Sequence, residues 1–213
     1  TALSDDSICP GDAVSLSAIA SGGSGQGYTY DWSNGDQGQN TTVAPSSTTT
    51  YTVTLEDNCS TPSATDSVEI YVNGLPDVQF SGVNREGCSP ITPTFTNTTD
   101  SSMVGTQCIW DFGNGNQASG CDSVSATFTQ PGCYDVTLSV RSPEGCIDSA
   151  TAQDYVCVRP YPTADFEFSP VQTNVMDPTI DFNNTSTGAT DYVWDFGGLD
   201  SSTAENPSFT FPS

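Results

Sequence analysis

The sequence predicts an all-β protein built from three tandem β-sandwich modules of about 80 residues each. Apolar and polar residues alternate with period two in stretches such as 13–19, 51–55 and 134–140, which is the pattern of half-buried strands. Gly, Asn, Asp and Pro interrupt these stretches about every 8–12 residues, the spacing of turns in a β-sandwich. No window shows an apolar period of about 3.6 residues with helix caps, so we expect almost no helix.

A tryptophan-containing element occurs once in each module. It reads Tyr-Asp-Trp-Ser-Asn-Gly at 30–35, Ile-Trp-Asp-Phe-Gly-Asn-Gly at 109–115 and Val-Trp-Asp-Phe-Gly-Gly at 193–198. We align the three tryptophans and predict that each is a core residue, because a buried tryptophan is a hallmark of immunoglobulin-like sandwiches. The alternative is a tryptophan that stacks on a sugar ring. The aligned residues are Trp32, Trp110 and Trp194.

Two further elements recur and help to place the module boundaries. The Tyr-x-Val-Thr-Leu stretch at 51–55 returns 83 residues later at 134–138, and the Asp-x-x-Phe-Ser stretch at 77–81 returns at 165–169. Short Pro-bearing linkers lie between the modules, and such linkers favour a stiff rod over a flexible string. The predicted modules are residues 1–73, 74–159 and 160–213.

The charge balance excludes several classes of function. The chain has 26 acidic side chains, three arginines, no lysine and no histidine, and its net charge is −23. Without His or Lys, the Ser-His-Asp, Cys-His and Schiff-base mechanisms and histidine-ligated metals are unavailable within the chain. The negative charge disfavours nucleic acids and anionic membranes. No apolar run approaches the roughly 20 residues of a membrane-spanning helix. We expect a non-enzymatic protein without catalytic residues or cofactors.

Eight cysteines indicate an oxidising, extracellular setting. Two of them each lie six residues from the Asn-Gly pair at 114–115, so a tight hairpin there should place them opposite each other. Two more should also pair, because one lies at the start of the strand 134–140 and the other at the end of the last strand of the second module. The remaining four occupy equivalent places in the first two modules. The expected disulfides are Cys9–Cys59, Cys88–Cys146, Cys108–Cys121 and Cys133–Cys157, and a disulfide between the first two modules would contradict the three-module layout.

Calcium is the metal that the composition leaves open. Carboxylate, amide and carbonyl oxygens are the ligands that hard cations prefer. The stretch Asp-Trp-Ser-Asn-Gly-Asp at 31–36 nevertheless lacks the spacing of a calcium-binding EF-hand loop. Divalent ions would in any case screen the negative charge diffusely. We expect the aspartate of each tryptophan element to accept hydrogen bonds from turn amides.

Several of these motifs resemble one family. The stretch 110–115 resembles the Trp-Asp-Phe-Gly-Asp-Gly signature of PKD domains, as does 194–197, and Pro-Gly-Cys-Tyr-Asp-Val-Thr-Leu at 131–138 resembles a strand of that family. The first module, with its motifs at 8–12 and 28–32, resembles the Ig-like repeats found beside PKD domains. In combination they resemble the very long, type IX-secreted surface proteins of Bacteroidota, including gliding-motility adhesins of the SprB type. The departures from the last Asp of the signature, which weaken any inference about calcium, are Asn114 and Gly198.

The resemblance implies a structural segment of a long extracellular cell-surface adhesin that acts in gliding or attachment. Its partners would be other modules of the same chain and a surface polysaccharide or protein ligand, without nucleic acid or direct membrane insertion. The alternative is a set of accessory modules of a secreted polysaccharide- or protein-degrading enzyme. A third hypothesis is a subunit of an extracellular filament in which neighbouring chains complete modules. Fold alone does not choose among them.

The resemblance also implies sites of modification. Four Asp-Ser-aliphatic triplets match the acceptor pattern of the general O-glycosylation seen in Bacteroidota. The simpler interpretation is that Asp-Ser begins a strand. The four serines are Ser7, Ser67, Ser123 and Ser149.

The third module is predicted to be incomplete. Residues 126–131 of the second module align with 208–212, and the second module continues with the strand 134–140 and a closing strand through Cys157. We therefore expect the natural chain to continue with a Tyr-x-Val-Thr-Leu-like strand, or another chain to supply one. Core residues would otherwise be exposed, and the candidates are Phe166, Phe168, Phe182 and Trp194.

Overall fold

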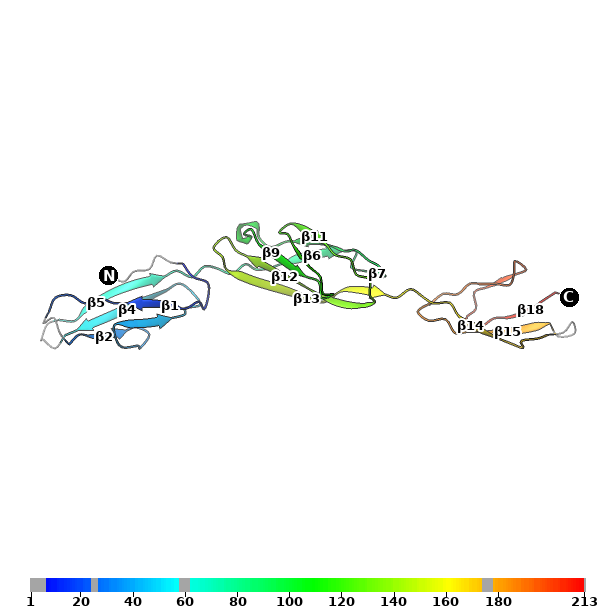
Figure 1. Ribbon diagram of the computed structural model, residues 1–213, viewed down its shortest axis with the longest axis horizontal. Helices are drawn as coiled ribbons and strands as arrows, with labels where there is room; N and C mark the ends of the chain where they lie inside the picture. The colour runs from blue at the N-terminus through cyan, green and yellow to red at the C-terminus, as the bar shows by residue number, and fades with distance from the viewer. Residues whose placement is uncertain (1–6, 24–26, 58–61, 174–177, 213) are drawn as a thin grey trace. The chain divides into compact units, whose positions relative to one another are not determined.

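The computed structural model describes residues 7–23, 27–57, 62–173 and 178–212, and nearly all of its regular structure is β-strand (Figure 1). Within these residues one short 3-10 turn, η1 (Ser101–Met103), is present, and Asp100 caps it by accepting a 2.9 Å hydrogen bond from the Ser102 amide. The prediction of an all-β chain with almost no helix is confirmed. Among the described residues, no helix is long and apolar enough to cross a membrane.

Backbone contacts divide the chain into two compact units. The predicted module boundaries remain a prediction, but each sheet draws its strands from a single predicted module. The first unit comprises Thr1–Val83, Thr94–Ala126 and Asp135–Gln153, and the second comprises Asn84–Pro93, Thr127–Tyr134 and Asp154–Ser213.

Two small sheets within residues 1–73 of the first unit enclose an apolar core. One sheet has the order β1-β3 and the other the order β2-β4-β5, with antiparallel neighbours throughout. Inward-facing residues alternate with exposed ones, so Leu16, Trp32, Val53 and Ile70 are buried together. The strands are β1 (Val14–Ser17), β2 (Thr29–Trp32), β3 (Asn40–Val43), β4 (Thr49–Glu56) and β5 (Ala64–Ile70).

Residues 74–159 form a larger β-sandwich. One sheet has the order β11-β8-β6 and the other the order β10-β9-β12-β13-β7, in which β7 and β13 pair in parallel. Phe95 from β8 and Trp110 from β9 are fully buried, and Val136 and Leu138 from β12 are buried with them. The strands are β6 (Phe80–Val83), β7 (Glu86–Cys88), β8 (Thr94–Asn97), β9 (Cys108–Asp111), β10 (Gln117–Ser119), β11 (Ser123–Ser125), β12 (Gly132–Arg141) and β13 (Ile147–Arg159).

The last five strands of the described chain all lie in the second unit. They form a three-stranded sheet of order β14-β15-β18 and a two-stranded sheet of β16 and β17. Phe211 donates its amide to the Pro178 carbonyl at 3.1 Å, as Phe128 donates to Ile91 at 2.9 Å, so Phe211 is the counterpart of Phe128. The predicted alignment of 126–131 with 208–212, which places Phe128 at residue 209 or 210, is therefore wrong at this position. The strands are β14 (Phe166–Ser169), β15 (Thr179–Asn184), β16 (Trp194–Asp195), β17 (Ser201–Ser202) and β18 (Ser208–Thr210).

Two of the three disulfides in the structure are pairs expected from the sequence. Cys108 bonds to Cys121 across the β9–β10 hairpin, where the Gly120 amide also donates to the Cys108 carbonyl at 3.1 Å. Cys133 bonds to Cys157, with their Cα atoms 4.2 Å apart. Both bonds join residues of neighbouring antiparallel or hairpin-connected strands, which is why local sequence spacing identified them.

The third disulfide joins Cys9 to Cys146, so the expected pairs Cys9–Cys59 and Cys88–Cys146 are wrong. This bond joins the first two predicted modules, which is the outcome stated above as contradicting the three-module layout, although no sheet contains strands from both of them. Cys88 is exposed and unbonded, and Cys59 lies outside the described residues.

The cause of this pairing is the position of the N-terminal segment. Ile8 forms a parallel bridge with Val72 and exchanges hydrogen bonds with Tyr71 and Asn73 at 3.0 and 2.8 Å. Cys9 therefore lies where the chain leaves the first predicted module. Cys146 directly follows the tight turn between β12 and β13, and the two cysteines meet with Cα atoms 5.5 Å apart.

Candidate functional site

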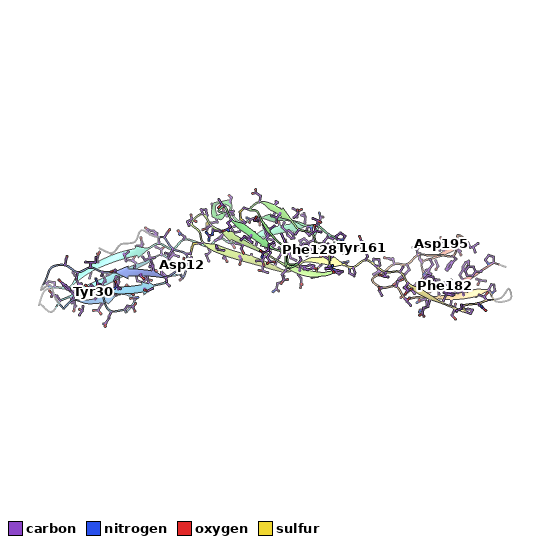
Figure 2. The ribbon with its side chains drawn as sticks, viewed as in Figure 1. Asp12, Tyr30, Phe128, Tyr161, Phe182 and Asp195 are labelled. Atoms are coloured by element: carbon purple, nitrogen blue, oxygen red, sulfur yellow. A yellow bond between two sulfur atoms is a disulfide. The ribbon has the colours of Figure 1, made fainter. Side chains whose placement is uncertain are left out.

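A cavity of about 620 Å³ lies within residues 162–211 of the second unit. Its apolar wall consists of aromatic side chains from three strands and from the loops that follow them. Phe182 from β15 and Asp195 from β16, labelled in Figure 2, belong to the two sheets that border the cavity. The aromatic lining residues are Phe166, Phe182, Tyr192, Trp194, Phe196 and Phe211.

The aromatic rings contact one another in edge-on and tilted arrangements. The centroid of Phe182 lies 5.5 Å from that of Trp194 and 5.4 Å from that of Phe196. Phe166 meets Trp194 edge-on, at 5.4 Å and an interplanar angle of 73°. These separations are the favoured ones for aromatic pairs. The wall is therefore a packed cluster, although Phe166 remains 50% exposed.

The polar rim of the cavity mainly serves the backbone of its own loops. The Asp165 amide donates to Ser186 Oγ at 3.0 Å, and the Ser186 amide donates to Asn184 Oδ1 at 2.9 Å. Asp195 Oδ1 accepts from the Gly198 amide at 2.8 Å. These bonds fix the shape of the loops, so the rim is preformed.

Two of the equivalent aromatic residues of the second predicted module are fully buried. Phe95 and Trp110 are each 0% exposed, and Leu138 of β12 pairs with Trp110 across the sheet. The indole nitrogen donates at 2.9 Å to a carbonyl ten residues downstream in both cases, from Trp110 to Gly120 and from Trp194 to Ala204. Equivalent residues thus form a solid core in one place and an open cavity in the other.

The core prediction holds for two of the three tryptophans. Trp32 and Trp110 are buried, which leaves neither free to stack on a sugar. Trp194 is only partly buried and faces the cavity. Phe168 is 45% exposed and Phe182 is partly buried, as expected for an incomplete module.

The predicted alignment of Trp32 with Trp110 is wrong by two residues. Asp31 accepts a side-chain hydrogen bond from Gln37, six residues on, and Asp111 accepts the equivalent bond from Gln117. Asp31 is thus the counterpart of Asp111, and Trp32 is the counterpart of Phe112 rather than of Trp110. A shift of two residues keeps a side chain on the same face of a strand, so both alignments predict burial.

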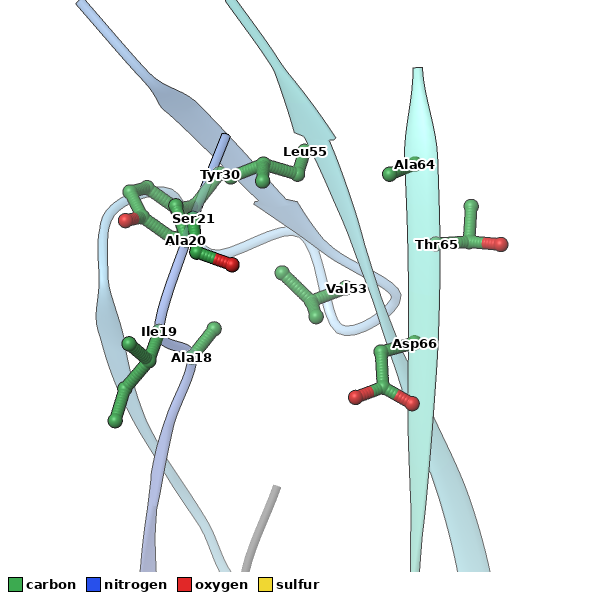
Figure 3. Close-up of a pocket in the computed structure, with 10 residues that line it drawn as sticks. All are labelled: Ala18, Ile19, Ala20, Ser21, Tyr30, Val53, Leu55, Ala64, Thr65 and Asp66. Atoms are coloured by element: carbon green, nitrogen blue, oxygen red, sulfur yellow. The ribbon is translucent and has the colours of Figure 1, made fainter. Parts of the chain in front are cut away.

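A second, smaller cavity of about 200 Å³ lies in the first unit, between the end of β1 and strands β2, β4 and β5 (Figure 3). Tyr30 lies beside it, at the position where the second module has Trp110. Figure 3 shows that Thr65 points away from the other lining residues, while its neighbours Ala64 and Asp66 point toward them. The lining carries a single charged side chain, Asp66.

The acidic residues do not gather into a metal centre in the part of the chain that the structure describes, where no group of three or more Cys, Asp or Glu side chains could hold an ion. The turn aspartates are engaged instead. The Gly113 amide, followed by the Gln117 side chain, holds the pKa of Asp111 below its usual value. Hydrogen bonds from Thr41 and then Asn34 lower the pKa of Asp36. The predicted bond to turn amides is confirmed for Asp111 and Asp195, whereas Asp31 accepts from the Gln37 side chain.

We expect calcium and magnesium to stabilise the chain equally. Millimolar concentrations of either ion would screen the net charge of −23, and we expect both to raise the melting temperature by about 2–4 °C, equivalent to about 1 kcal/mol. Calorimetry with each chloride at matched ionic strength measures the two shifts. A rise with calcium alone would indicate a specific site, because magnesium demands a smaller octahedral one.

The four serines of the predicted O-glycosylation pattern are all exposed. The Ser67 and Ser149 amides donate to the preceding aspartates at 2.9 and 2.7 Å, and Ser67, Ser123 and Ser149 lie on strands. Their positions fit both the acceptor hypothesis and the interpretation that Asp-Ser begins or borders a strand. Glycosylation stays a prediction.

Comparison with protein families matches residues 73–158 to the PKD domain. This region contains strands β6 to β12 and nearly all of β13, together with the buried core around Trp110. Comparison with curated protein sequences gives no match.

Three solved structures are similar to parts of the chain. A carbohydrate-binding module of the β-sandwich superfamily aligns over 52% of this chain, with 17% identity and a TM-score of 0.38, and the chain spans 54% of that module's length. The three N-terminal domains of the bacteriophage RB49 outer capsid protein Hoc align over 94% of this chain and 77% of their own, with 15% identity and a TM-score of 0.37. The Ca²⁺-stabilized, ice-binding adhesin of an Antarctic bacterium aligns over 88% and 56%, with 15% identity and a TM-score of 0.47.

Proposed function

We propose that residues 1–213 are a load-bearing structural segment of an extracellular, cell-surface adhesin that acts in gliding or attachment. The observation that carries this proposal is the Cys9–Cys146 disulfide, which closes a loop across 137 positions of the chain. A segment that links a cell to a distant surface must withstand tension along its length, and this bond changes the path that tension takes.

Tension applied at the two ends would pass from Cys9 directly to Cys146 through the disulfide. Residues 10–145 would then carry no force, although they contain the first predicted module and most of the second. Beyond Cys146 the tension follows the chain itself from residue 147 onward, and the Cys133–Cys157 bond lies beside this path. One covalent bond thus takes the place of the strand pairings within residues 10–145 as the force-bearing connection.

The setting is supported by the same cysteines. Disulfides persist in oxidising, extracellular compartments, and one PKD-domain match covers residues 73–158. Uniform negative charge keeps neighbouring copies of a dense surface layer apart. The gliding role and the type IX secretion route rest on the resemblance of the sequence motifs alone.

Pulling single molecules by their ends tests the proposal. In the native chain the 10–145 loop should stay locked, whereas Cys9→Ser should release about 100 additional residues once the remaining two disulfides are allowed for, or about 350 Å of extended chain. Optical tweezers measure this gain in contour length directly.

The matched control is Cys88→Ser, which removes the exposed, unbonded cysteine and should leave the contour length unchanged. Native chain that extends as far as the Cys9→Ser variant would show that the loop carries the load, and the proposed function would fail.

A further inference from the structure

The open aromatic cavity of residues 162–211 is bordered by a strand with an unused edge. Within the described residues β16 pairs only with β17, through Trp194 opposite Ser202 and Asp195 opposite Ser201. Its counterpart β9 has neighbours on both sides, β10 and β12. Val193, which precedes β16 on this edge, is 82% exposed. An edge of this kind presents unpaired backbone groups to another strand.

The two earlier modules show what occupies this edge. In the second, β12 places Leu138 opposite Trp110 and Thr137 opposite Asp111. In the first, β4 places Leu55 opposite Tyr30, Thr54 opposite Asp31 and Val53 opposite Trp32. Both partner strands therefore carry the sequence Val-Thr-Leu in the same register, with Thr opposite the aspartate of the tryptophan element. By this rule the occupant of the β16 edge has Leu opposite Trp194 and Thr opposite Asp195.

Gly197 lies beside the β16 edge, at the position where Gly113 leaves room for the backbone of β12 in the second module. A Cβ atom on Gly113 would lie 2.6 Å from the Asp135 carbonyl oxygen of β12, so the second module needs glycine where its strand passes. Gly197 is the counterpart in the third module, and nothing in the described chain lies within 4 Å of its added Cβ position. The space that β12 fills beside Gly113 is thus open beside Gly197.

Charge limits which strand can enter. Residues 160–213 contain eight acidic side chains and neither Lys nor Arg, and three of the acids, Asp165, Asp191 and Asp195, line the cavity. An occupant with acidic outward positions would be repelled, whereas neutral or basic ones are favoured. Both internal examples have the neutral Thr opposite the aspartate.

We propose that the β16 edge and the aromatic cavity beside it bind an extended polypeptide strand, antiparallel to β16, that carries a Val-Thr-Leu core with neutral or basic outward residues. Alternate apolar side chains of this strand would cover Phe166, Phe182 and Trp194, while its backbone pairs with the edge, which is the β-strand-addition mode of recognition. The proposal rests on β16 and its neighbours and is independent of the Cys9–Cys146 bond, so either can fail without the other.

A cross-linking experiment on the whole chain tests the register. The probe is a peptide of residues 131–141 with Cys133→Ser, Asp135→Ser and Ser139→Cys, because Ser139 lies opposite Ile109 and hence its equivalent would lie opposite Val193. The chain carries Val193→Cys in a Cys88→Ser background. We expect a disulfide between the two, formed at least about tenfold faster than with a peptide that carries its cysteine at position 135, about 13 Å further along the strand. Leu199→Cys, an equally apolar exposed residue in the turn after β16, is the matched control and should not react above background.

Two further measurements separate the alternatives. Peptide at about 100 times its dissociation constant should slow proteolysis of residues 163–213 about a hundredfold, and a Thr137→Lys peptide should bind about tenfold more tightly than a Thr137→Asp peptide at low salt. Equal cross-linking at both peptide positions would overturn the proposed register. Protection by a soluble polysaccharide but by none of the peptides would assign the cavity to a sugar and overturn the proposal.

Discussion

Trp110→Ala should unfold the second predicted module, whereas Trp194→Ala should leave the chain nearly as stable as before. Trp110 is fully buried, its ring lies 5.4 Å from Phe80 and 5.9 Å from Phe95, and its indole nitrogen donates to Gly120. Truncating a buried aromatic side chain costs about 3–5 kcal/mol, which is comparable with the whole stability of a small domain at about 5–15 kcal/mol. Trp194 is partly exposed and loses less apolar burial, about 1 kcal/mol.

Hydrogen exchange followed by mass spectrometry measures the difference, because it reports each module separately. Amides of residues 94–141 should lose protection in Trp110→Ala and keep it in Trp194→Ala. Trp110→Phe serves as the conservative control and should retain most of the protection. Similar losses in both alanine variants would show that residues 162–211 are packed as tightly as the second module.

The second large effect is the order of proteolysis. Residues 163–213 should be removed at least about tenfold faster than residues 7–159, because cleavage follows the population of locally open states. No cysteine follows Cys157, and the last two sheets contain three and two strands. Phe166 and Phe168 are about half exposed, whereas Phe95 and Phe112 are buried.

The protease must cut at apolar residues, since the chain has no lysine and three arginines. A time course with thermolysin, analysed by intact-mass spectrometry, gives the order of cleavage. The internal control is the first module, which lacks an internal described disulfide but encloses the Leu16 and Trp32 core. If all three predicted modules were cleaved at the same rate, the prediction that the third module is incomplete would be wrong.

Local patterns accounted for much of the fold. The alternation at 134–140 predicted β12, and the Asn-Gly pair at 114–115 predicted the hairpin that joins Cys108 to Cys121. Both features depend on residues within about ten positions of each other, and turn chemistry fixes their register. The repeat spacing further predicted that Phe166, Phe168 and Trp194 would be incompletely covered, and this exposure directed attention to the cavity.

The candidate site itself was only partly predictable. The sequence identified the aromatic residues as core candidates but gave no signal for the polar rim formed by Asp165, Asn184 and Ser186, whose hydrogen bonds join segments 20 or more residues apart. The register of the Val-Thr-Leu strands was likewise hidden, because aligning Trp32 with Trp110 displaced the first module by two residues. Period two gives the same burial pattern for either alignment.

The sequence by itself determined the strand content, the tryptophan elements, the two local disulfides and the excess of negative charge, because each of these depends on composition or on nearby residues. Tertiary structure alone decided the Cys9–Cys146 bond and the register in which a strand would lie beside β16. The first depends on Ile8 pairing with Val72, 64 positions away, which brings Cys9 to the turn before Cys146. The second depends on which strand lies beside β16 in space, and alternation along a strand specifies which face is apolar but not which neighbour covers it.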